Sequence, residues 1–145
     1  MVFKIKLEHA CVCGWLNQEY NPMEIKEIFS EKDDLVIIWA RVKEVKSDSE
    51  IEMIWLNPNN KETINISVLV EKTTEERKYR NVWTVAETKG LKLLENCYGK
   101  WTVLIKHNED VLAKYQFEFK NILAIYNSSK KVSDIENIST FDFSG

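Results

Sequence analysis

The chain has 145 residues, 44% of them hydrophobic and 30% charged, and a formal net charge of −3 at pH 7. This length and composition describe one globular domain, and they exclude a disordered or membrane-spanning chain. The scattered basic residues include only three Arg, which argues against a nonspecific nucleic-acid binder. Val, Ile, Thr and the aromatic residues make up about a third of the chain, whereas Ala occurs five times. This balance favours an all-β domain over a helical bundle.

Alternating apolar and polar residues predict a series of strands along the chain. In segment 3–15, the odd-numbered residues from Phe3 to Trp15 are expected to share one face, with Lys4, Lys6 and Glu8 on the other. Segment 35–45 begins apolar on both faces, which predicts a central strand. Further strands are expected at 51–55, 64–70, 83–85, 101–105 and 111–119. Segment 23–29 is ambiguous, because it fits a short helix while its last residue, Phe29, is also suited to begin a strand.

Turn residues separate these segments, and the loop 107–110 between two alternating segments predicts a hairpin. Seven or eight short strands without a long helix indicate a two-sheet sandwich or a small barrel. We expect one domain over residues 1–126, which includes a further strand at 122–126. Residues 127–145 contain five Ser and alternate weakly, and they are expected to form a loosely ordered tail.

Several landmarks together resemble a known class of domain. They are Phe29, the acidic turn Asp33-Asp34 before an apolar strand, Trp55-Leu56-Asn57-Pro58, Gly99-Lys100-Trp101-Thr102-Val103 and Tyr115-Gln116-Phe117-Glu118-Phe119. In this order they resemble the small immunoglobulin-like modules of prokaryotic proteins, over roughly residues 25–120. The resemblance implies an immunoglobulin-like antiparallel β-sandwich of seven to eight strands, with a role in binding or assembly. The Cys–Trp–Cys spacing of antibody domains is absent, since no second Cys follows Cys11 and Trp39 at the required distance.

One imidazole and two thiols alternate at His9, Cys11 and Cys13. On a strand these three side chains would point the same way, and thiolate with imidazole suits Zn²⁺ or Cu⁺. Cys97 or His107 would then supply a fourth ligand. The alternative is core packing, because the same positions continue an apolar stripe and free Cys is commonly buried. We favour core packing and predict no cofactor.

The five Trp residues divide into two groups. Trp39, Trp55 and Trp101 lie on the apolar sides of their strands and are predicted to be core residues. The remaining two, with three Tyr, are candidates for an exposed aromatic patch of the kind enriched at interfaces. The candidate partner-binding residues are Trp15, Tyr20, Tyr79, Trp83 and Tyr98. An exposed Trp15 or Trp83 would alternatively stack against a carbohydrate.

The sequence contains few residues suited to catalysis. Only two His and four Gly occur, and the common nucleophile, phosphate-binding and metalloprotease motifs are absent. We therefore expect a non-enzymatic module that mediates protein–protein interaction or assembly, including self-association. Metal binding and carbohydrate binding are the alternatives, and neither a nucleic acid nor a membrane is expected as a partner. The odd number of Cys and the charged N-terminal segment predict a cytoplasmic protein without a signal peptide.

Overall fold

The structure is a computed structural model, and it describes residues 3–121. The predicted strand 122–126 and the predicted tail 127–145 lie outside the described residues. In chain order the elements are β1 (Lys6–Leu16), β2 (Pro22–Ile25), β3 (Ile28–Ser30), β4 (Leu35–Lys43), β5 (Ser49–Leu56), β6 (Glu62–Val70), β7 (Tyr79–Glu87), α1 (Thr88–Leu91), β8 (Gly99–His107) and β9 (Asp110–Lys120). Within the described part, no helix is long and apolar enough to cross a membrane.

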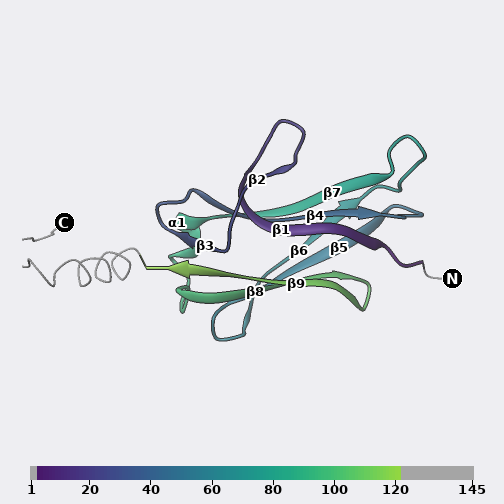
Figure 1. Ribbon diagram of the computed structural model, residues 1–145. Helices are drawn as coiled ribbons and strands as arrows, with labels where there is room; N and C mark the ends of the chain where they lie inside the picture. Colours follow the sequence, from purple (N-terminus) through teal and green to yellow (C-terminus); the bar gives the residue numbers. More distant parts are fainter. Residues whose placement is uncertain (1–2, 122–145) are drawn as a thin grey trace, which may run out of the picture.

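The strands form two sheets that pack face to face (Figure 1). One sheet has the order β2-β1-β4-β7 and the other has the order β3-β9-β8-β5-β6. Neighbouring strands are antiparallel except β3 and β9, which run parallel. This arrangement confirms the predicted immunoglobulin-like β-sandwich. The nine strands within residues 3–121 exceed the predicted seven or eight because segment 23–29 forms parts of two short strands and no helix.

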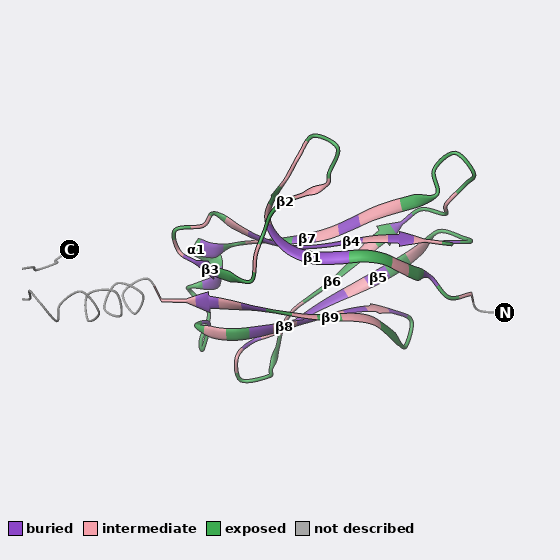
Figure 2. Cartoon of the chain, in the orientation of Figure 1, coloured by how far each residue is buried: buried purple, intermediate pink, exposed green. Residues whose placement is uncertain are grey.

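The core between the sheets is built from inward-facing aromatic and aliphatic side chains. Figure 2 shows in purple where these buried residues lie along the strands. Trp55 and Trp101 meet edge to face with ring centroids 6.4 Å apart, and Trp101 also stacks on Phe117 at 6.0 Å. Both Trp are almost completely buried, which confirms the core prediction for these two residues. The predicted hairpin is also confirmed, because His107 pairs with Asp110 across the tight turn between β8 and β9.

A β-bulge in β1 divides the first strand into two parts that face different ways. The pairing of β1 with β4 shifts between Leu7 and His9. Ile5 belongs to the main core before the bulge, whereas Ala10 and Val12 belong to it afterwards. The prediction that the odd-numbered residues from Phe3 to Trp15 share one face is therefore wrong. A bulge inserts one extra residue, and one residue is enough to exchange the two faces of a strand.

Candidate interaction surface

A second, smaller apolar layer lies on the outer side of the sheet β2-β1-β4-β7. Its buried members are Cys11, Cys13, Ile37 and Trp39, which form a cluster separate from the main core. Cys11 pairs with Trp39 across β1 and β4, and Trp39 pairs in turn with Trp83 on β7. Trp39 is thus buried as predicted, but in this outer layer and not between the sheets. An outward face is buried only when another segment covers it.

That cover is the loop 17–21 between β1 and β2. The Asn17 side-chain oxygen accepts hydrogen bonds from two backbone N–H groups of the loop, at 2.9 and 3.0 Å, and so holds the turn. Tyr20 has a positive φ of 62°, and its carbonyl accepts a hydrogen bond from Nε1 of Trp39 at 2.8 Å. The Tyr20 ring stacks on Trp83 with centroids 5.0 Å apart. The loop therefore closes over Trp39 and presents its own aromatic ring beside Trp83.

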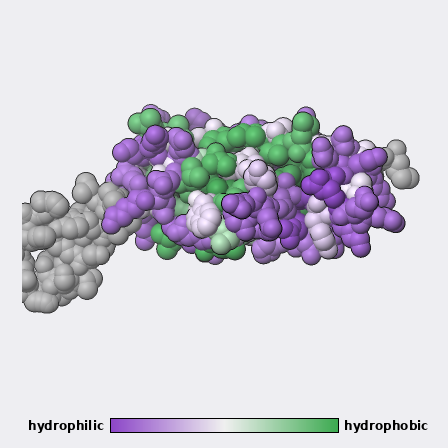
Figure 3. All heavy atoms as spheres, turned by 90° about the horizontal axis from the view of Figure 1, so that it is seen from above, coloured by the Kyte–Doolittle hydropathy of each residue, from purple (hydrophilic) through white to green (hydrophobic). Residues whose placement is uncertain are grey.

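Around this covered layer, large apolar side chains remain exposed. Trp15 is 48% exposed and Ile25 is 58% exposed, and both lie on the β1–β2 hairpin. We define the outer patch as Trp15, Tyr20, Met23, Ile25, Trp83 and Val85. Figure 3 views this face of the molecule and shows apolar residues gathered across its middle, with hydrophilic residues around them. Apolar patches of this kind are typical of surfaces that contact another molecule.

Arg41 stands at the border of the outer patch. Its guanidinium lies 5.3 Å from the ring centre of Trp39 and 5.9 Å from that of Tyr79. It also donates hydrogen bonds to the side-chain oxygens of Asn21, at 2.6 Å, and Asn81, at 3.0 Å. The guanidinium is therefore held in place, and it ties the loop 17–21 to β7.

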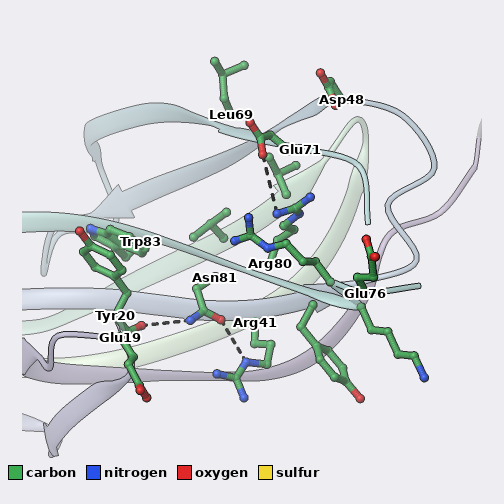
Figure 4. Close-up of a pocket in the computed structure, with 15 residues that line it drawn as sticks. Glu19, Tyr20, Arg41, Asp48, Leu69, Glu71, Glu76, Arg80, Asn81 and Trp83 are labelled. Carbon is green, nitrogen blue, oxygen red and sulfur yellow. Dashed lines mark hydrogen bonds and ion pairs between the residues drawn. The ribbon is translucent and has the colours of Figure 1, made fainter. Parts of the chain in front are cut away.

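A groove of about 810 Å³ continues from the outer patch along β7 (Figure 4). Tyr20 and Trp83 belong to both the groove and the patch. All three Arg of the chain line the groove, and one of them, Arg80, pairs with Glu71 at 3.7 Å. The charged lining residues are Glu19, Arg41, Asp48, Glu71, Glu76, Arg77, Lys78 and Arg80. Cations and anions are balanced, so the groove suits an amphipathic surface better than a strongly charged ligand.

The structure brings together most of the predicted partner-binding residues. Tyr20, Tyr79 and Trp83 line the groove, and Trp15 lies on the outer patch. Tyr98 lies elsewhere, because its ring stacks on Phe119 at 5.3 Å and its hydroxyl hydrogen-bonds to Glu31.

The predicted metal ligands lie on one face but differ in exposure. His9 is exposed with its ring 5.8 Å from that of Trp39, whereas the thiols of Cys11 and Cys13 are buried in the outer layer. Neither proposed fourth ligand belongs to that layer, because Cys97 lies in the main core and His107 packs against Phe3. In residues 3–121 no group of three or more His, Cys, Asp or Glu side chains is placed to hold a metal ion.

The two thiols of the outer layer are expected to differ in reactivity. A hydrogen bond from Cys13 lowers the pKa of Cys11, whereas the same bond and burial raise the pKa of Cys13. Because the thiolate is the nucleophile, iodoacetamide should alkylate Cys11 before Cys13 in the folded protein. Peptide mass spectrometry over a time course measures this order. Cys13→Ala should slow the labelling of Cys11, and equal labelling of both thiols would contradict the assignment.

Part of this surface was not predicted from the sequence. Met23, Ile25 and Val85 are exposed apolar residues on strands, and their neighbours in sequence do not distinguish them from core residues. Arg41 follows an apolar run, so its position beside two aromatic rings depends on which strands are neighbours. The Trp and Tyr residues were the part of this surface that the sequence indicated, and four of the five predicted residues lie on the outer patch or the groove.

Comparison with known proteins identifies the class of fold to which this structure is similar. No protein-family model matches the chain, and no curated protein matches it. An immunoglobulin-like protein from Pseudomonas aeruginosa is similar in structure with a TM-score of 0.51 and 12% identity, over 81% of this chain and 98% of that one. An alkylpurine DNA glycosylase from Pseudomonas fluorescens matches with a TM-score of 0.50 and 7% identity, over 80% of this chain and 30% of that one. At these identities the likeness concerns the fold alone, and the chain is an immunoglobulin-like β-sandwich module.

Proposed function

We propose that this chain is a non-catalytic module that binds another protein through the outer patch of the sheet β2-β1-β4-β7. The partner would present an apolar surface that covers Trp15 and the stacked rings of Tyr20 and Trp83. We place this interaction in the cytoplasm, because free thiols such as Cys11 and Cys13 suit a reducing compartment.

The observation that supports this proposal is an exposed apolar patch on a rigid base. Trp39 and its neighbours are already buried beneath the loop 17–21, so the exposed rings are held without a partner. Rings that are fixed in advance lose little conformational freedom on binding. Trp, Tyr and Arg are also the residues that most often dominate binding energy at interfaces, and all three types occur here.

A pair of matched variants tests the proposal. Trp15→Ser with Val85→Ser removes two exposed members of the patch, whereas Leu93→Ser with Val111→Ser removes two exposed apolar residues elsewhere. In a pull-down, a protein that binds to both wild type and the control variant should no longer bind to the patch variant. Calorimetry with that purified partner should then show at least about tenfold weaker binding for the patch variant, equivalent to about 1.4 kcal/mol.

Two results would contradict the proposal. One is equal binding of the purified partner by the patch variant and the control. The other is a change in tryptophan fluorescence with a panel of glycans, abolished by Trp15→Ser, since this would assign the patch to carbohydrate.

A further inference from the structure

The four edge strands of the sandwich differ in how well they are protected against pairing with a strand of another chain. Within residues 3–121, β2 and β7 border one sheet, and β3 and β6 border the other. β3 has three residues, and β2 has four and begins with Pro22, so both offer little backbone to a new strand. β7 carries a charge near each end, at Arg80 and Glu87, and the guanidinium of Arg80 hydrogen-bonds to the carbonyl of Lys72. Short length, Pro and charge are the usual means by which proteins prevent edge-to-edge pairing.

β6 has none of these protections along most of its length. It is nine residues long, and segment 63–70 reads Thr-Ile-Asn-Ile-Ser-Val-Leu-Val without charge, Pro or Gly. Ile66 pairs with the buried Met53 and so faces inward, yet it is 40% exposed. On the other face Leu69 is 74% exposed. This strand therefore offers an open backbone edge beside incompletely covered apolar side chains.

The sequence of β6 is complementary to itself in antiparallel orientation. With Ile66 opposite Ile66 of a second copy, the residues from Glu62 to Val70 lie opposite one another, and residues 64–68 pair clear of the bulge that β6 makes opposite Trp55 and Leu56. Ile64 of one copy then lies opposite Val68 of the other on the inner face. In this register, inward-facing residues lie opposite inward-facing residues, and outward-facing residues lie opposite outward-facing ones. One position beyond the strand, Lys61 meets Glu71, an opposite-charge pair that occurs twice by symmetry.

We propose that two copies of this chain associate through β6, in antiparallel register about Ile66, so that their β3-β9-β8-β5-β6 sheets become one continuous sheet. This contact is isologous, so each β6 edge is covered by the other and the assembly closes at two copies. Ile66 of one copy covers Ile66 of the other. None of the six residues that define the outer patch lies on β6.

Like charges introduced across the new strand pair test this dimer. Asn65 is opposite Ser67 in the proposed register, so Asn65→Lys with Ser67→Lys places like charges directly across both symmetric pairs. We expect the single chain to tolerate these changes, because Asn65 hydrogen-bonds to Glu62 and Ser67 pairs with Glu52 on β5, so each new Lys lies near a carboxylate. The control is Leu93→Lys with Val111→Lys, which adds the same charge at exposed positions away from β6.

Light scattering over a concentration series gives the readout. Wild type and control should approach twice the 17.1 kDa chain mass as concentration rises, whereas the β6 variant should keep the mass of one chain. A single-chain mass for wild type at every concentration overturns the proposal. So does dimerisation of the β6 variant equal to that of the control.

Cross-linking tests the register independently. Ile66→Cys places two thiols directly opposite each other, at a separation that a disulfide can bridge with diamide as the oxidant. Leu69→Cys is the control, because residue 69 is more exposed but lies opposite Thr63 in this register. A covalent dimer is expected for Ile66→Cys alone. Failure of both dimer tests leaves the outer patch proposal intact, since its variants do not touch β6.

Discussion

Replacing Trp101 by alanine is expected to lower the free energy of unfolding by about 3–5 kcal/mol. Trp101 is 0% exposed at the centre of the core. Its ring stacks on Phe117 and meets the edge of Trp55, so the truncation leaves a cavity bordered by rigid rings. Nε1 of Trp101 also donates a hydrogen bond to the Cys97 carbonyl at 2.7 Å, and this buried acceptor would lose its partner.

Chemical denaturation monitored by circular dichroism measures this loss. The matched control is Trp15→Ala, since Trp15 is 48% exposed and its removal should cost less than about 1 kcal/mol. Small domains are stable by about 5–15 kcal/mol, so Trp101→Ala leaves a marginal fold or none. Similar losses for the two variants would show that Trp101 is not a centre of the core.

Replacing Gly99 by alanine is expected to cost at least about 1–3 kcal/mol. Gly99 begins β8 with a φ of +132°, a backbone conformation that residues with a Cβ rarely adopt. An added Cβ would also lie 3.0 Å from Cβ and 3.1 Å from Cγ of Pro58. The rigid proline ring cannot rotate away, so backbone strain at residue 99 and steric overlap with Pro58 both destabilise the variant.

Gly90→Ala provides the control for this prediction, because the added methyl group would have no atom within 4 Å apart from its chain neighbours and the backbone of its own helix. Gly90 is exposed in α1, where alanine has the better helix propensity, so the change should be neutral or stabilise by up to about 1 kcal/mol. Denaturation midpoints of the two variants should therefore move apart. Equal midpoints would indicate that the backbone at Gly99 relaxes to accept a side chain.

Much of the sheets was predictable because most of their strands alternate apolar and polar residues. Trp101, Val103 and Ile105 all point into the core as the alternation predicted. Two landmarks far apart in sequence, Pro58 and Gly99, also lie close together in the fold. Pro58 follows the end of β5 and Gly99 begins β8, and a Cβ added to Gly99 would come within 3.0 Å of the Pro58 side chain.

The outer layer was not predictable from the same pattern. The bulge between Leu7 and His9 leaves the alternation of apolar residues intact, so the change of face has no signature in the sequence. The burial of Cys11 was expected, but the side on which it is buried depends on this one backbone irregularity. The cover over Trp39 depends on a carbonyl of Tyr20, and a backbone carbonyl is present at every residue.

The parallel pairing of β3 with β9 has a consequence for how the chain folds during synthesis. Phe29 on β3 pairs with Phe119 on β9, which follows it by 90 positions (119 − 29) in the sequence. The second sheet therefore cannot be completed until its last strand has left the ribosome. Contacts between residues so distant in sequence also form slowly. In the interval the nascent chain exposes Phe29 and the uncharged β6 segment, and this is when it most needs protection from aggregation.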